Sequence, residues 1–311
     1  MGQRRGPDIV HRWEGNPVLS PEDVPFRLAD ICNAGVAKVN NEYVLLVTIQ
    51  GLKGYYWIYA ARSRDGYHFE IEETPLMGPS GEWPDPTVDE EGVMDARVTP
   101  FGDSYYVVYN AVGRNGYRLA LAQTSDFRSL QRLGAISEPD TKGGALFPEK
   151  INGKFVRLER PWEGGSIWLS YSEDLVYWGE SVFVMGPRGG YWDGNRVGAA
   201  TPPMKIAQGW LFLYYGIKET SAGPLFRLGA AILDPEQPWK VAGRTNVPVL
   251  SPRTLLERLG DVPNLVFSCG ALIEPNNEVK LYYGAANSCI CLGVTSVDDI
   301  VQTCSESRKE F

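Results

Sequence analysis

An aspartate and an arginine two residues apart, Asp95 and Arg97, open an apolar stretch of the chain. A carboxyl group in such a position can serve as a general acid or base if its surroundings set its protonation state. The segment Met94-Asp-Ala-Arg-Val-Thr leads into a strongly β-forming run, so a strand would hold the acid in place. The alternative is a structural ion pair or a turn aspartate, because most charged residues in proteins are solvated or paired.

A second group of charged residues surrounds one predicted hairpin and contains three cations and two carboxylates. They are Lys142, Glu149, Lys150, Glu159 and Arg160. The chain has a formal net charge of −8, so cations gathered around one element stand out and indicate an anion site. The alternative is that some of these cations are ordinary residues of surface turns.

Three further polar residues fall at matching points of other apolar segments: Asn33, Tyr215 and Asn287. Taken singly, each fits a hydrogen-bonded polar group at a strand end better than a ligand contact. The chain has no Gly-x-Ser-x-Gly elbow, phosphate-binding loop or dinucleotide fingerprint. Its two histidines lie away from these motifs, so a Ser-His-Asp triad is not expected.

A short element that recurs five times indicates which structures would position these residues. It reads Ser-Arg-Asp-Gly-Tyr-His-Phe at 63–69, and its aspartates are Asp65, Asp126, Asp174, Asp234 and Asp298. A β-rich run precedes each aspartate, which lies where a turn is expected. Such self-similarity is typical of repeat folds, and four-stranded propeller blades have periods in this range. The innermost strands of the blades would bring side chains together at one axis.

Each repeat also contains a hairpin signal between apolar runs, at Asn40-Asn41, Gly102-Asp103, Asn152-Gly153, Gln208-Gly209 and Asn276-Asn277. We therefore predict an all-β, five-bladed β-propeller over residues 1–311 as a single domain. The blades would span roughly 31–80, 92–140, 142–187, 196–250 and 264–303. The segment from Ser251 to Leu259 could form one short helix, and both ends of the chain would serve as closure or packing segments.

Composition narrows the classes of partner. The chain has 30 basic and 38 acidic residues, which argues against nucleic acid because phosphate backbones require clustered cations. Five cysteines without a zinc spacing indicate free thiols in a reducing compartment and no metal site. The chain begins without an apolar leader and has no membrane-length apolar run. We expect a soluble, cytoplasmic protein without a membrane partner. The oligomeric state stays open, and a homo-oligomer is one option.

Several segments resemble glycoside hydrolase family 130, the β-mannoside phosphorylases and related β-mannosidases. The resemblance extends from Asn16-Pro-Val-Leu to Asp299. It rests on Leu146-Phe-Pro-Glu-Lys-Ile-Asn-Gly-Lys-Phe, Arg160-Pro161, Asp174-Leu-Val-Tyr-Trp-Gly, Arg227-Leu-Gly-Ala-Ala-Ile-Leu-Asp, Gly260-Asp-Val-Pro-Asn-Leu-Val-Phe and Tyr282-Tyr-Gly-Ala-Ala. The family is a five-bladed propeller, so the resemblance and the internal repeats imply the same fold.

The resemblance also implies roles for single residues. Asp95 matches the catalytic aspartate of an Asp-x-Arg motif, with Arg97 beside it among the substrate-binding residues. In the phosphorylases, phosphate attacks the anomeric carbon with inversion while the aspartate protonates the departing oxygen. Such an acid must stay protonated near neutral pH. Lys142 and Arg160 match residues that bind the phosphate.

Other positions depart from the family pattern. Tyr215 stands where phosphorylases commonly have histidine and hydrolases tend to have glutamate, and we assign it to the phosphate site. Asn287 replaces an aspartate that contacts the mannosyl unit, and Thr48 occupies the place of an arginine. Glu159 stands where many phosphorylases have histidine, and could be a base for hydrolysis or a salt-bridge partner of Arg160. With Asn33, Arg97 and Asn287, Glu159 completes the predicted substrate-binding set.

These inferences predict inverting phosphorolysis of β-mannosides, either mannobiose or mannooligosaccharides, to α-mannose 1-phosphate. No cofactor is expected, and inorganic phosphate would be the co-substrate. The first alternative is an inverting exo-β-mannosidase in which Glu159 or another carboxylate activates water. The second is a propeller that binds glycans without turnover, which the intact Asp95 disfavours.

Overall fold

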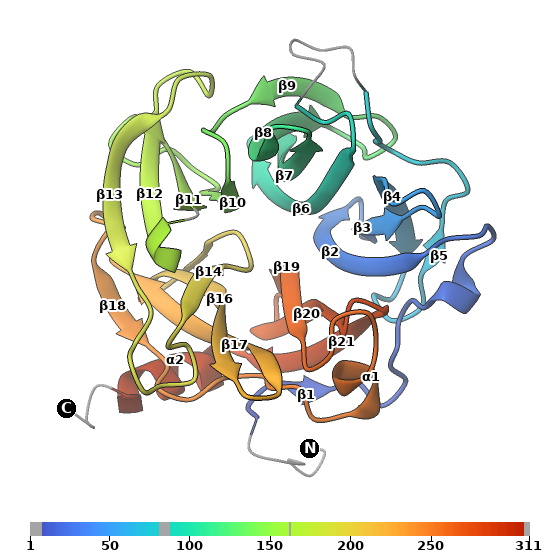
Figure 1. Ribbon diagram of the computed structural model, residues 1–311. Coiled ribbons are helices and arrows are strands. Elements are labelled where there is room, and N and C mark those ends of the chain that lie inside the picture. The colour runs from blue at the N-terminus through green and yellow to red at the C-terminus, as the bar shows by residue number, and fades with distance from the viewer. Residues whose placement is uncertain (1–7, 81–87, 162, 308–311) are drawn as a thin grey trace.

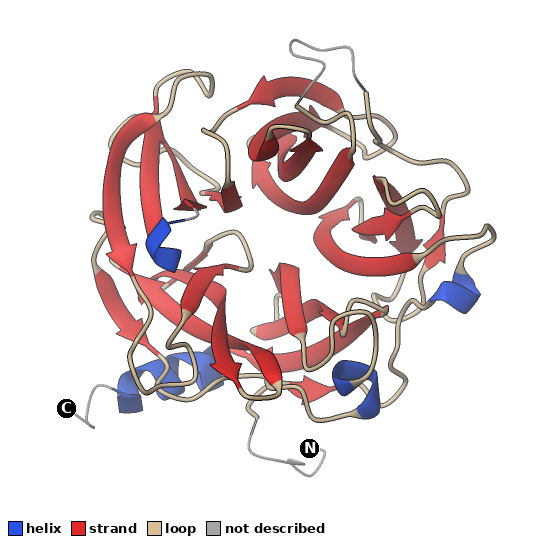
Figure 2. Ribbon diagram, in the orientation of Figure 1, coloured by secondary structure: helices blue, strands red, loops and turns tan. Residues whose placement is uncertain are grey.

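Five blades stand around a central axis in the computed structural model, which describes residues 8–80, 88–161 and 163–307 (Figure 1). Strands make up most of the regular structure (Figure 2). The predicted all-β, five-bladed propeller is thereby confirmed. Residues 1–7, from which the absence of an apolar leader was inferred, lie outside the described ranges. In the part of the chain that the structure describes, no helix is long and apolar enough to span a membrane.

The blades follow one another in chain order. The first contains β2 (Asp30–Val39), β3 (Glu42–Gln50), β4 (Tyr56–Ser63) and β5 (Glu70–Ile71). The second contains β6 (Gly92–Phe101), β7 (Ser104–Gly113), β8 (Gly116–Thr124) and β9 (Gln131–Ala135). The third contains β10 (Thr141–Leu146), β11 (Phe155–Pro161), β12 (Ile167–Ser172) and β13 (Gly179–Met185).

The fourth blade contains β14 (Arg196–Ala199), β15 (Met204–Ile206), β16 (Gly209–Thr220), β17 (Gly223–Leu233) and β18 (Val241–Arg244). The fifth contains β19 (Val266–Ile273), β20 (Glu278–Ala285) and β21 (Cys289–Ser296). Paired strands within each blade run antiparallel, and one parallel pair, Tyr56 with Gly92, joins the first two blades.

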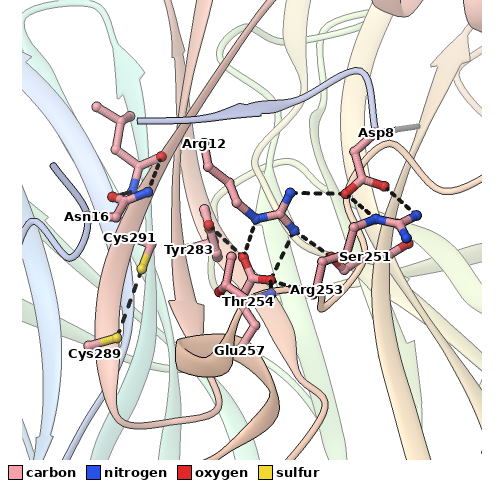
Figure 3. Close-up of polar contacts among 11 residues, drawn as sticks. Asp8, Arg12, Asn16, Ser251, Arg253, Thr254, Glu257, Tyr283, Cys289 and Cys291 are labelled. Atoms are coloured by element: carbon pink, nitrogen blue, oxygen red, sulfur yellow. Dashed lines mark hydrogen bonds and ion pairs between the residues drawn. The ribbon is translucent and has the colours of Figure 1, made fainter. Parts of the chain in front are cut away.

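The N-terminal segment closes the ring of blades. Strand β1 (His11–Arg12) pairs with β21 and becomes the fourth strand of the fifth blade. Arg12 donates to both carboxylate oxygens of Glu257, at 2.6 and 3.0 Å, and to Asp8 at 3.1 Å (Figure 3). Glu257 lies in α1 (Leu255–Arg258), which forms within the segment predicted to be a short helix. Two 3₁₀ turns, η1 (Pro21–Asp23) and η2 (Glu163–Gly165), complete the connections.

Four of the five repeated aspartates shape turns through their side chains. The Oδ1 atoms of Asp65, Asp174 and Asp234 each accept hydrogen bonds from two main-chain N–H groups two and three residues ahead. Asp126 accepts one such bond, from Arg128 at 2.9 Å. These aspartates hold the turns that lead into the outermost strands of their blades, β5, β9, β13 and β18.

The fifth copy differs, because it begins helix α2 (Val297–Glu306). The Ser296 side chain caps this helix by accepting from the Asp299 amide at 3.0 Å. A serine three residues before an acid starts a helix as readily as it shapes a turn. The expectation of a turn at Asp298 was therefore wrong.

The apolar core lies between neighbouring blades, because each blade buries the alternating apolar side chains of its strands. Val156, Leu158 and Leu169 of the third blade, for example, pack with Trp210 and Phe212 of the fourth. The innermost strands of four blades each contain a β-bulge, where the register with the neighbouring strand shifts. These strands are β2, β6, β10 and β19. A bulge of this kind re-aims the side chains beside it.

Candidate active site

Asp95 lies in the bulge of β6, between the paired positions Met94 and Arg97. Its backbone has a φ of +57°, an uncommon value for a residue other than glycine, and its side chain is 7% exposed. The main-chain N–H of Asp95 donates to Thr48 Oγ1 at 3.0 Å. The local backbone and a neighbouring blade thus fix the direction of the buried carboxyl group.

Two amides hold the carboxylate of Asp95. Asn33 donates from Nδ2 to Oδ1 at 2.8 Å, and Asn110 donates from Nδ2 to Oδ2 at 2.9 Å. Asn33 belongs to the predicted set and comes from the bulge of β2. Asn110 was not predicted; its only sequence signal is a single amide inside the apolar run of β7.

Arg97 is 1% exposed and points into the interior. Its guanidinium donates to the main-chain carbonyls of Ala199 at 3.2 Å, Ala200 at 3.0 Å and Asp95 at 3.2 Å. It therefore ties the second blade to the interrupted inner strand of the fourth. These contacts favour a positioning role, and binding of substrate by Arg97 stays a prediction.

Lys142 and Arg160 face each other across the pairing of β10 with β11. Arg160 is 3% exposed, and its Nε donates to Tyr215 Oη at 2.7 Å. Tyr215 in turn packs its ring on Phe267 and against Gly198, where an added Cβ would lie 2.4 Å from the tyrosine ring. The predicted phosphate-site residues therefore lie together, with Tyr215 orienting Arg160.

The Lys142 ammonium lies 3.3 Å from the centroid of the Tyr117 ring. Burial lowers the pKa of Lys142 below its usual value; Asp95 opposes this shift, while the cations Arg160 and Arg196 add to it. Arg196, from the start of β14, is thus a third cation near this cluster. The sequence indicated no role for Arg196 because it belongs to none of the motifs that suggested chemistry.

Glu159 does not share the face of β11 that carries Arg160, because successive side chains of a strand alternate. Its carboxylate pairs with Arg157 at 2.6 Å and accepts a hydrogen bond from Ser170. It lines a cleft of about 500 Å³ between the second and third blades, together with Trp178. The alternative in which Glu159 pairs with Arg160 is therefore wrong, and contact with substrate stays a prediction.

Asn287 lies in the turn between β20 and β21, with a φ of +54°, and is half-buried. Ala285 pairs with Val266, the first residue of the inner strand β19, so this turn lies where the inner strands begin. Asp95 lies near the same end of β6. The structure thus places Asn287 at the end of the axis that carries Asp95, and its sugar contact stays a prediction.

A cavity of about 320 Å³ lies at the other ends of the inner strands. Its lining is mostly apolar and includes Val36, Val98, Pro148, Pro202 and Ala271. It contains none of the predicted site residues. The predicted site residues therefore lie outside this cavity.

Comparisons with known proteins agree with this arrangement. Residues 9–306 match glycoside hydrolase family 130, described as beta-1,4-mannooligosaccharide phosphorylase. A beta-1,4-mannooligosaccharide phosphorylase of Ruminococcus albus is 32% identical over 305 residues, with 94% of this chain and 90% of that protein covered. A beta-1,2-mannobiose phosphorylase of Listeria innocua is also 32% identical, over 341 residues, with 90% of this chain and 94% of that protein covered.

A solved structure supports the same assignment. The complex of beta-1,2-mannobiose phosphorylase from Listeria innocua with beta-1,2-mannobiose superimposes with a TM-score of 0.87 at 31% identity. The match covers 96% of this chain and 99% of that one. Fold, internal repeats and sequence similarity over nearly the whole length agree, and the chain belongs to glycoside hydrolase family 130.

Proposed function

We propose that this enzyme catalyses inverting phosphorolysis of β-mannosides, mannobiose or mannooligosaccharides, and releases α-mannose 1-phosphate. The observation that carries the proposal is the position of a buried carboxyl group, Asp95, beside the cations Lys142 and Arg160. Phosphorolysis needs both: an acid for the departing sugar and a site for an attacking anion.

The proposed reaction proceeds in one displacement. A phosphate oxygen forms a bond to the anomeric carbon from the face opposite the departing sugar, while the bond from that carbon to the glycosidic oxygen breaks. Asp95 gives its proton to the departing oxygen, directly or through a sugar hydroxyl. The configuration at the anomeric carbon inverts, so a β-mannoside yields the α-phosphate.

Lys142 and Arg160 are proposed to bind the phosphate, with Arg196 as a third cation. A guanidinium offers several donors in a plane and suits phosphate oxygens. Tyr215 accepts a hydrogen bond from the Nε of Arg160 at 2.7 Å and so fixes the orientation of the guanidinium proposed to bind the anion. Asn33 and Asn287 are proposed to contact the mannosyl unit.

Hydrolysis is the second candidate, and the geometry favours it less. It would need a second carboxylate to activate water opposite the departing sugar. Glu159 was the sequence candidate, yet its carboxylate is engaged by Arg157 and Ser170 in the gap between two blades.

We further propose a cytoplasmic enzyme that needs no cofactor and no nucleic-acid or membrane partner, with inorganic phosphate as co-substrate.

Product analysis tests this proposal. The protein is incubated with β-1,2- and β-1,4-mannobiose, each with and without inorganic phosphate, and the products are identified by NMR. We expect mannose and α-mannose 1-phosphate from at least one substrate, and only when phosphate is present. Release of free mannose alone, at the same rate without phosphate, would establish the hydrolytic alternative instead.

A further inference from the structure

Two asparagines from different blades hold the two oxygens of Asp95 separately. Asn33, on β2 of the first blade, contacts Oδ1 at 2.8 Å, and Asn110, on β7 of the second blade, contacts Oδ2 at 2.9 Å. They are 6% and 1% exposed, respectively. Asn110 lies across from Met94, the residue before the bulge, and so directly supports Asp95.

The carbonyl oxygen of each amide has no hydrogen-bond partner among the described residues. The Oδ1 atoms of Asn33 and Asn110 are both buried, and neither accepts a hydrogen bond within the described residues. The terminal torsion of an asparagine is broad and roughly two-fold. Turning either amide over would therefore sacrifice only its bond to Asp95, and would present a carbonyl oxygen there instead of an N–H.

A general acid needs both kinds of partner during one reaction. An ionised carboxylate only accepts hydrogen bonds, whereas a protonated carboxyl group also donates one. An amide can meet either need, because its nitrogen donates and its oxygen accepts. A lysine or arginine in the same place could serve only the ionised form.

We propose that Asn110 and Asn33 form an amide clamp that holds Asp95 in both protonation states. Both donate through nitrogen to the carboxylate; Asn33 turns to accept from the carboxylic acid, while Asn110 remains a donor in both states. Asn110 is thus a positioning residue, which acts on the reaction through Asp95. The inference rests on the proposed role of Asp95 as general acid.

The proton balance of the reaction fits this arrangement. Asp95 gives its proton to the departing oxygen, and the two amide donors then stabilise the carboxylate left behind. An attacking phosphate that carries one proton returns a proton to Asp95 once the phosphate ester has formed. The charged and titratable groups around Asp95 are Arg97 of β6, Lys142 of β10, Cys32 of β2, Cys269 of β19 and Tyr56 of β4.

Two substitutions of Asn110 test the clamp. Asn110→Leu keeps the size but removes the donor, and Asn110→Asp keeps the shape but places a second carboxylate beside Asp95. We expect kcat to fall about 10- to 100-fold in both, as for small misplacements of a catalytic group. Both KM values should stay unchanged, because Asn110 is 1% exposed and would act only through its bond to Asp95.

The pH profile of kcat distinguishes positioning from mere structural support. The alkaline limb reports loss of the proton from the acid, and a lost donor no longer favours the ionised form. The limb should therefore move to higher pH in Asn110→Leu, and further in Asn110→Asp, where a like charge is added. Asn110→Asp is nearly isosteric, so it keeps the test valid if the leucine variant fails to fold.

Asn246→Leu is the matched control. Asn246 is also buried and donates to the Ser307 carbonyl at 3.0 Å, away from Asp95. It should lose thermal stability while its pH profile keeps the wild-type position. An unshifted alkaline limb in both Asn110 variants, or KM changes as large as those in kcat, would overturn the clamp. An active Asp95→Asn variant would instead overturn the assignment of the acid itself.

Discussion

The contact between Arg160 and Tyr215 fixes the guanidinium that we propose to bind phosphate. The tyrosine hydroxyl takes the Nε donor at 2.7 Å, and packing on Phe267 and Gly198 restricts the tyrosine ring. A side chain fixed in this way loses less entropy when it binds a ligand. We therefore expect Tyr215 to contribute to phosphate affinity through Arg160, without a charge of its own.

Tyr215→Phe should raise the KM for phosphate several-fold and leave the KM for the sugar unchanged, because only the support of Arg160 is lost. Arg160→Lys should raise the KM for phosphate further, since a lysine lacks the planar set of donors. Tyr214→Phe is the control: that hydroxyl donates to Asp193 at 2.9 Å, on the other face of β16. Steady-state kinetics decide the matter, and equal changes in both KM values would indicate a structural role.

Lys142 should make phosphate binding sensitive to alkaline pH. Burial and neighbouring cations lower its pKa, so this lysine loses its charge at a lower pH than an exposed lysine would. The KM for phosphate should rise as pH increases through that range, where inorganic phosphate itself stays dianionic. In Lys142→Arg the side chain keeps its charge, so the KM for phosphate should rise less with pH. A KM that climbs equally in both proteins would contradict this account.

The sequence pointed to Asp95, Lys142 and Arg160 because their types and order match a family pattern, and the structure brings these three predicted residues near one another. It could not identify Asn110, since an amide in an apolar strand looks like any satisfied polar group. It also misjudged the surroundings of Glu159, because strand alternation at that position becomes clear only once the pairing of β11 is known. Contacts across blades depend on bulges, which leave no distinct signal in one sequence.

At the scale of elements, the repeated aspartates act as turn residues and not as chemical groups. Asp174 accepts from the amides of Val176 and Tyr177 at 2.9 and 3.0 Å. These main-chain donors lower the pKa of Asp174. The repeat was visible in the sequence because the same local hydrogen bonds are needed before each of these outermost strands. In the last copy, the same residue types begin α2 instead.

Asp174→Ala should lower the Tm by a few degrees without changing kcat, because the turn loses two acceptor contacts far along the chain from Asp95. Asp174→Asn retains an acceptor oxygen, so its Tm should lie between those of the wild type and of Asp174→Ala. Asp103→Ala, in the turn between β6 and β7, provides a control: among the described residues its side chain makes none of these bonds. Calorimetry measures the Tm of each variant. An unchanged Tm in Asp174→Ala would show that the turn forms without its aspartate.

At the scale of the whole molecule, the ring of blades is closed by a short strand and by ion pairs of Arg12, among them the one with the buried Glu257. The Arg12 and Glu257 side chains are 19% and 1% exposed, and Tyr283 also donates to the glutamate at 3.0 Å. Five blades could be predicted because each repeat carries its own turn and apolar runs. The pairing partner of the first segment could not, because two residues of strand have no periodicity.

Arg12→Met should lower the free energy of unfolding by about 3–5 kcal/mol, because it leaves the carboxylate of Glu257 buried without its cation. Lys205→Met is the control: its pair with Glu149 is 61% and 48% exposed, and such pairs contribute about 0–1 kcal/mol. Denaturant unfolding measures both. Equal losses in the two variants would mean that the closure does not depend on this ion pair.

The role of Asp95 as general acid is the central claim, and one comparison tests it most directly. The Asp95→Asn variant is assayed with phosphate on its natural type of substrate, a mannobiose, and on an aryl β-mannoside whose leaving group departs without a proton. We predict a loss in kcat of roughly 10²–10⁴ on the disaccharide and little loss on the aryl mannoside. Near-normal activity on the disaccharide, or equal losses on both substrates, would contradict the account.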